Sequence, residues 1–124
     1  MLRTVLALLA LAGLVSLAVG LAGAEDAPLP IKEIMKQAHG GGANSLLNKA
    51  TGANASKEDK EKLLNLYKDL AANKPPQGDE KSWGEKTSAL VKAAEANVKG
   101  EAGAGNKVRQ AANCMACHRV HRPS

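Results

Sequence analysis

The chain contains only two cysteines, Cys114 and Cys117, and His118 directly follows the second of them. A helix turns by about 100° per residue, so these three positions fall on one helical face. Any fold of this chain must therefore present two sulfur atoms and an imidazole together, a few residues before the C-terminus.

The spacing Cys-x-x-Cys-His is the attachment motif of c-type haem. Each thiol can add to one vinyl group of the porphyrin and form a thioether, and the adjacent imidazole can then bind the iron. We therefore predict one covalently bound haem c per chain, held by Cys114 and Cys117, with His118 as the proximal iron ligand.

Three other chemistries use cysteines at this spacing. A thioredoxin-like redox pair belongs beside a βαβ pattern, which the sequence does not show. A zinc site made of the two cysteines, His118 and His121 would crowd four ligands into one short segment. A structural disulfide would leave the adjacent histidine unexplained. Haem attachment accounts for all of these residues.

The composition leaves room for a large apolar cofactor. The sequence has no Phe, one Trp and one Tyr, although aromatic side chains, at about 150–250 Å² of buried surface each, dominate most cores. Many of the remaining apolar residues are alanines, which bury little surface. A porphyrin in the interior would supply the apolar mass that the side chains lack.

The N-terminus predicts export. Arg3 precedes an apolar run over residues 5–21, and Ala22-Gly23-Ala24 fits a small-residue cleavage site. We predict a signal peptide over residues 1–24, one domain over residues 25–124, and a periplasmic or otherwise exported protein without stable membrane insertion. Because about 20 apolar residues can span a bilayer, an uncleaved membrane anchor is the alternative.

The rest of the chain predicts four helices and no strand. Apolar residues at helical spacing begin near Pro30, and residues 40–42, all glycine, end or break that segment before residues 45–50. The second helix starts at Ser56 and carries Leu63, Leu66, Tyr67 and Leu70, and a capping box at Ser82 starts the third. The last is capped by Asn106 and runs through the cysteine motif to near Pro123. We therefore expect an all-α, antiparallel four-helix bundle, a fold that can hold a cofactor between facing helices.

These features resemble the class II cytochromes c, the group of cytochrome c prime and its low-spin monohaem relatives. The resemblance rests on Cys114-Met115-Ala116-Cys117-His118 at the end of a four-helix chain, on Arg122 four residues after the histidine, and on Trp83 near the start of the third helix. It implies a left-handed bundle with haem between the helices, and a basic residue, Arg122, close to the haem. Many relatives have an aromatic residue where this chain has His121.

The resemblance also implies that the sixth iron position decides the function. Low-spin relatives fill it with a methionine of the first helix, which makes Met35 the expected distal ligand here. The alternative is that Met35 only packs in the core. His39, one turn later, is a rival ligand, although its place at the helix end predicts an exposed cation. His121 is expected to face solvent or a haem propionate. Met115 lies between the cysteines and should face away from the ring.

We therefore predict an electron carrier and not an enzyme. Positive charge near the haem would steer an acidic redox partner, and the expected residues are Lys107, Arg109, Arg119 and Arg122. The net charge of +5 is spread among acidic residues, a pattern that does not favour nucleic-acid binding. The chain is expected to be a monomer or a homodimer.

Two other functions remain open from the sequence. The first is a five-coordinate haem protein that binds nitric oxide or another small gas, with Met35 packed but uncoordinated. The second is a membrane-tethered haem subunit of a larger redox complex, with the apolar N-terminal run retained as its anchor.

Overall fold

A computed structural model describes residues 26–124, and the predicted signal peptide lies outside this part. The described residues form one short 3-10 helix and six α-helices: α1 (Ile31–His39), η1 (Gly42–Asn44), α2 (Leu46–Thr51), α3 (Lys57–Ala72), α4 (Glu80–Val98), α5 (Ala104–Ala111) and α6 (Cys114–His121). No strand occurs between residues 26 and 124, so the all-α prediction is confirmed for this part of the chain.

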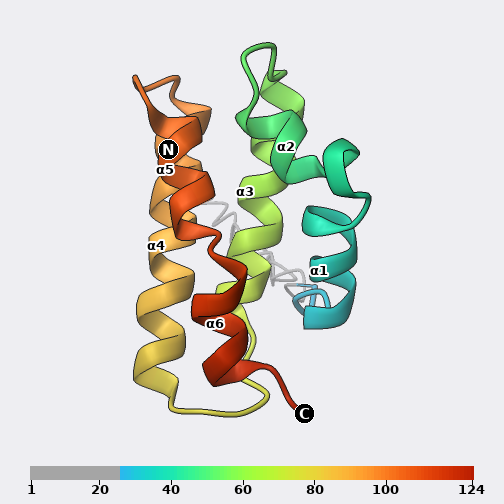
Figure 1. Cartoon of the computed structure of the whole chain (residues 1–124), viewed down its shortest axis with the longest axis vertical. Coiled ribbons are helices and arrows are strands. Elements are labelled where there is room, and N and C mark those ends of the chain that lie inside the picture. Colours follow the sequence, from blue (N-terminus) through green and yellow to red (C-terminus); the bar gives the residue numbers. More distant parts are fainter. Residues whose placement is uncertain (1–25) are drawn as a thin grey trace, which may run out of the picture.

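The helices pack around α3 and α4, which lie side by side along the long axis of the molecule (Figure 1). On one side α5 packs against α4, and α6 continues beyond α5 toward the C-terminus. On the other side α1 and α2 follow one another along α3. This arrangement places α1 and α6, the two helices that carry the predicted iron ligands, on facing sides of the same end of the molecule.

The second predicted helix is confirmed as α3. Its N-cap is Ser56, whose Oγ accepts a hydrogen bond from the backbone N–H of Asp59 at 3.1 Å. The predicted apolar stripe is its buried face, formed by Leu63, Leu66, Tyr67 and Leu70. This side of α3 contributes much of the core.

The third helix, α4, begins earlier than expected. Its N-cap is Asp79, whose Oδ1 accepts from the backbone N–H of Ser82 at 2.7 Å, so the predicted start at Ser82 was wrong by one short turn. Asp and Ser are about equally favoured as N-cap residues, so the sequence does not distinguish Asp79 from Ser82 as the start of this helix. Gly78, with φ of +79°, turns the chain immediately before Asp79 and makes that residue the cap.

The glycine-rich segment divides the first predicted helix in two. Gly41 and Gly42 have φ of +93° and +55°, a region that side-chain-bearing residues avoid. The chain leaves α1 here, forms η1 and re-enters a helix at Ser45, whose Oγ accepts from Asn48 N–H at 3.2 Å. The expected break is confirmed, and α2 is a separate helix.

The last predicted helix is also divided, a break that the sequence did not lead us to expect. The N-cap of α5 is Gly103 instead of Asn106, and α5 ends before Asn113. Asn113 has an extended backbone, and its Oδ1 accepts from Ala116 N–H at 3.2 Å, so it starts a new helix. Asparagine side chains commonly compete with helical hydrogen bonds in this way. The cysteine motif therefore forms a short helix of its own, α6.

Both large aromatic residues lie in the core. Tyr67 and Trp83 are buried, and the indole Nε1–H of Trp83 donates to the backbone oxygen of Asn73 at 2.8 Å. Besides Tyr67, the large side chains that are fully buried are those of Ile34, Leu63, Leu70, Val108 and His121. Between residues 26 and 124, no helix combines the length and the apolar character needed to cross a bilayer.

Candidate cofactor site

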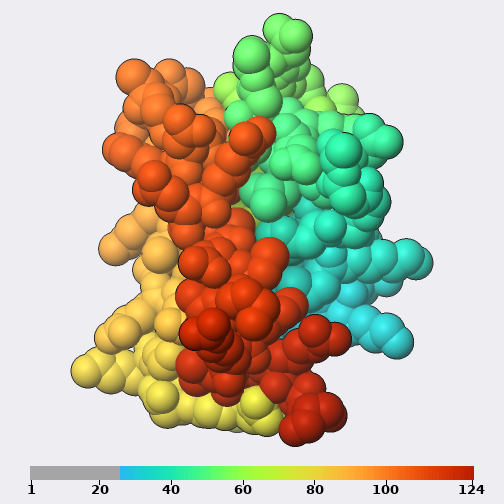
Figure 2. All heavy atoms as spheres, viewed as in Figure 1, coloured from blue at the N-terminus to red at the C-terminus, as the bar shows by residue number. Residues whose placement is uncertain are grey.

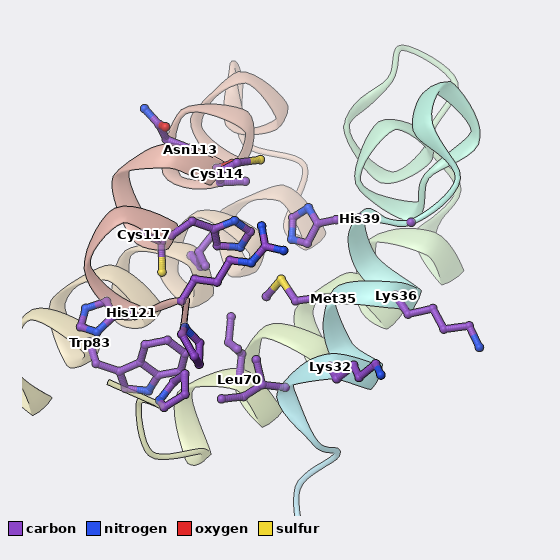
Figure 3. A pocket seen from close by; sticks show the side chains of 18 of the residues that line it. Lys32, Met35, Lys36, His39, Leu70, Trp83, Asn113, Cys114, Cys117 and His121 are labelled. Carbon is purple, nitrogen blue, oxygen red and sulfur yellow. The ribbon is translucent and has the colours of Figure 1, made fainter. Parts of the chain in front are cut away.

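A cavity of about 690 Å³ lies between α1 and α6 (Figure 3). Leu70 of α3 and Trp83 and Leu90 of α4 form apolar parts of its wall. None of the residues that line it is an aspartate or a glutamate. The volume falls within the range of about 300–1,000 Å³ that is typical of sites for small molecules and cofactors.

Helix α6 contributes the predicted attachment residues. Cys114, Cys117 and His118 all line the cavity, as their shared helical face requires. Both cysteines are free thiols in this structure. Burial raises the pKa of the Cys117 thiol, while Lys86 acts in the opposite direction. Met115 is 57% exposed and does not line the cavity, in line with the prediction that it faces away.

Helix α1 contributes two further donor side chains. Met35 and His39, four residues apart, both line the cavity, and Figure 3 shows the Met35 sulfur and the His39 ring on its α1 side. Met35 is half-buried and packs against the core. The structure thus places the predicted distal residue across the cavity from the cysteine motif.

The expectation of an exposed His39 was wrong. Its ring is half-buried and stacks on Tyr67 with a centroid distance of 5.9 Å and an interplanar angle of 28°. Burial lowers the pKa of His39, and the nearby His118 lowers it further. The helix end was expected to hold a solvated cation, but tertiary packing against α3 makes the neutral imidazole the favoured form.

The expectation that His121 faces solvent was wrong as well. It is only 2% exposed, and its ring meets the edge of Trp83 at a centroid distance of 5.3 Å. Nδ1 lies 2.8 Å from the backbone oxygen of Gln77, and Nε2 lies 3.1 Å from Ser82 Oγ. A carbonyl oxygen only accepts, so Nδ1–H donates to the backbone oxygen of Gln77, and in the neutral ring Nε2 then accepts from the Ser82 hydroxyl. His121 therefore anchors the end of α6 to the loop between α3 and α4.

That loop is shaped to fit His121. An ideal Cβ on Gly78 would lie 2.8 Å from His121 Nδ1 and 2.9 Å from the backbone oxygen of Val120, so only glycine fits at this approach. The side-chain amide of Gln77 also donates to the backbone oxygen of Arg122. The loop therefore contacts three consecutive residues at the C-terminal end of α6.

At the same end of the molecule, hydrogen bonds hold the residues that lead into α1. Trp83, which packs on His121, donates to the backbone oxygen of Asn73. The Asn73 side chain donates in turn to the backbone oxygen of Leu29 at 2.9 Å, and Leu29 N–H donates to Asp69 Oδ2 at 3.3 Å. One chain of contacts thus runs from α6 through α4 and α3 to the residues just before α1.

Tyr67 carries a polar group without a partner. It is buried, and no hydrogen-bond partner for its hydroxyl is found among the described residues. Burial raises the pKa of Tyr67, and Cys114 raises it further. A buried hydroxyl that lacks a partner costs about 1–3 kcal/mol.

Only one of the four expected cations lies at the cavity. Arg122 lines it, but Lys107, Arg109 and Arg119 do not, and Arg109 Nε–H donates instead to Thr51 Oγ1 at 2.8 Å. Two exposed residues of α1, Lys32 and Lys36, line the cavity and were not predicted. The sequence signal that could have identified these two cations is their position on the helix of Met35, three residues before it and one residue after it. On the face shown in Figure 2, α1 and α6 lie next to each other.

The donor side chains that line the cavity fit a haem that is covalently attached along one of its edges. Two thiols and an imidazole lie on one wall, a thioether and a second imidazole lie on the other, and the space between them has apolar walls. Within residues 26–124, no three His, Cys, Asp or Glu side chains gather closely enough to bind a metal ion by themselves.

Comparisons with protein-family models, curated proteins and solved structures give no match for this chain.

Proposed function

We propose that this chain is an exported monohaem c-type cytochrome that carries single electrons and is not an enzyme. In this proposal the helices form an antiparallel four-helix bundle, with α1 and α2 as one side and α5 and α6 as another, and the haem lies between α1 and α6. One observation carries the proposal: Met35 lines, from α1, the same cavity that Cys114, Cys117 and His118 line from α6.

When bound, haem supplies reversible one-electron chemistry at iron. The residues of this chain would bind and tune it. Cys114 and Cys117 would hold one edge of the ring, and His118 would supply the proximal imidazole. The Met35 thioether would occupy the opposite side and raise the reduction potential, because a soft sulfur donor favours ferrous iron.

The cavity wall would further adjust the potential. Leu70, Trp83 and Leu90 present apolar surface to the cavity, and such a shell limits the access of water to a metal site. Exclusion of water disfavours the more highly charged ferric state. The apolar wall and the Met35 thioether would therefore both raise the reduction potential of the haem.

The charges at the cavity support an acidic redox partner. Lys32, Lys36 and Arg122 are exposed and line the cavity, and no carboxylate lines it with them. A positively charged surface at the site of electron exchange accelerates encounters with a negatively charged protein.

A gas-binding haem protein is the second candidate. The observation that favours it is the contact between Met35 and the buried core, since a methionine held by packing need not bind iron. A small gas such as nitric oxide would then occupy the sixth position. The third hypothesis, a membrane-tethered subunit, depends on residues 1–24, which lie outside the described part of the chain.

Expression of the full chain in a host that matures c-type cytochromes tests the proposal. We expect a red protein whose colour survives acid–acetone extraction, which removes haem that is not covalently bound. The ferric form should show a weak far-red band of methionine ligation that disappears in Met35→Ala. A Cys114→Ser/Cys117→Ser variant should lose its haem in the same acid–acetone extraction.

Two results would contradict the proposal in different ways. A stably folded but colourless wild-type protein would exclude the haem protein altogether. A high-spin wild-type spectrum with ready binding of nitric oxide would retain the haem but favour the gas-binding function. Mass spectrometry of the exported protein would show whether residues 1–24 are removed.

A further inference from the structure

The α1 side of the cavity offers two possible metal donors, while the role of distal ligand needs only one. Met35 and His39 are four residues apart and therefore lie on one face of α1, with Cβ atoms about 5–6 Å apart. Both side chains line the cavity from α1, whereas His118 lines it from α6.

We propose that His39 is a second donor to the sixth iron position, which it shares with Met35 by exchange. The inference rests on the proposed function, because it requires a haem in this cavity. It assigns to the protein two six-coordinate forms, one with a thioether and one with an imidazole opposite His118.

His39 is available for this role in a way that His121 is not. In the described part of the chain, the His39 ring makes a stacking contact with Tyr67 but no hydrogen bond. Both ring nitrogens of His121 are engaged, with Gln77 and with Ser82. Of these two cavity histidines, only His39 can turn a nitrogen toward a metal without breaking a hydrogen bond.

The surroundings of His39 also favour the form that binds metals. The His39 ring is half-buried and stacks on Tyr67, and such burial disfavours the charged imidazolium. A neutral imidazole has a free lone pair for iron. Replacement of Met35 by His39 would break one sulfur–iron bond and form one nitrogen–iron bond, with no electron transferred and no proton released.

The two donors would give the haem different potentials. A thioether stabilises ferrous iron, whereas the harder imidazole nitrogen stabilises the ferric state. Exchange toward His39 would lower the potential. It would also keep the sixth position closed when Met35 leaves, so small gases would meet a competing internal ligand in both forms.

Three variants of the haem-loaded protein test the inference: Met35→Ala, Met35→Ala/His39→Ala and, as a matched control, Met35→Ala/Lys36→Ala. Lys36 lines the same cavity from the same helix and could itself donate a nitrogen. The measurements are the ferric absorption spectrum, the midpoint potential and the affinity of the ferrous protein for carbon monoxide.

We expect Met35→Ala to lose the far-red band but to remain low-spin, with a lower potential than the wild type. Met35→Ala/His39→Ala should become high-spin and bind carbon monoxide about tenfold more tightly or better, because no internal ligand competes. The Lys36 double variant should match Met35→Ala.

The inference is overturned if Met35→Ala and Met35→Ala/His39→Ala share one high-spin spectrum and one carbon monoxide affinity. It is also overturned if only the Lys36 variant loses the low-spin state. Failure of the proposed function looks different, because the wild-type protein would then carry no covalent haem. The variants are therefore compared only after the haem content of each protein has been measured.

Discussion

Nδ1 of His121 lies 2.8 Å from the backbone oxygen of Gln77, although the two residues are 44 positions apart in the sequence. This contact fixes the C-terminal end of α6 one turn beyond His118. It makes the position of the predicted proximal ligand depend on the loop between α3 and α4.

Replacement of His121 tests this anchor. His121→Ala should lower the free energy of unfolding by about 2–4 kcal/mol, because it leaves a cavity beside Trp83 and removes two hydrogen bonds. Urea unfolding measures the effect. His121→Phe, which keeps the contact with Trp83, should cost less. Val120→Ala, at a side chain that is 39% exposed, should change stability by less than about 0.5 kcal/mol. Equal losses for His121→Ala and Val120→Ala would refute the anchor.

The close approach of Gly78 to His121 yields a second prediction. Gly78→Ala combines a positive φ of +79° with contacts of 2.8 and 2.9 Å at the new Cβ. Gly100→Ala is the matched control, since Gly100 has a similar φ of +75° but no atom within 4 Å of the place that its new methyl group would take. We expect about 1 kcal/mol of destabilisation at Gly100 and at least about 2 kcal/mol at Gly78. Thermal unfolding of both variants would show whether the extra loss exists.

The buried hydroxyl of Tyr67 predicts a stabilising substitution. Tyr67→Phe should raise the free energy of unfolding by about 1 kcal/mol at pH 7, because it removes a polar group that has no partner in the described structure. Burial raises the Tyr67 pKa, so the unfolded chain loses this proton first as the pH rises. The wild type should therefore lose stability above about pH 10, and the advantage of Tyr67→Phe should grow there. A difference that stays constant up to about pH 11 would contradict this.

The break between α5 and α6 predicts unequal roles for two asparagines. Asn113 caps α6 through its hydrogen bond with Ala116 N–H, whereas Asn106 is exposed within α5. Asn113→Ala should cost about 1 kcal/mol, and Asn106→Ala should be neutral or slightly stabilising. The two variants differ only in position, so their denaturation midpoints can be compared directly. The reverse order would indicate one continuous helix.

The cations at the cavity predict a charge effect on electron exchange. Lys32→Glu/Lys36→Glu should slow oxidation of the reduced haem protein by ferricyanide, an anion, by about tenfold at low salt. Lys107→Glu, on α5 and away from the cavity, is the control and should have a small effect. Stopped-flow rates at increasing salt should converge, because mobile ions screen the charges. Because Lys107→Glu changes the net charge half as much as the double variant, half as large a decrease in the logarithm of the rate would show that only the net charge matters.

The sequence alone determined the features that depend on local chemistry. Cys114, Cys117 and His118 had to share a face, because helical geometry places residues at this spacing together. The stripe of α3 and its cap at Ser56 follow from the same periodicity and from short-range hydrogen bonding. Three consecutive glycines at residues 40–42 were expected to end or break the first helix, because glycine is a poor helix former.

Only the tertiary structure decided which side chains meet across the molecule. His39 and His121 both look like surface residues near helix ends, yet α3 buries one ring and the α3–α4 loop binds the other. Besides Arg122, the cavity takes its cations, Lys32 and Lys36, from α1 and none from α5. The reason is physical: a helical pattern specifies which face of each segment is apolar, but burial, pKa and neighbours arise from contacts between segments that are distant in the chain.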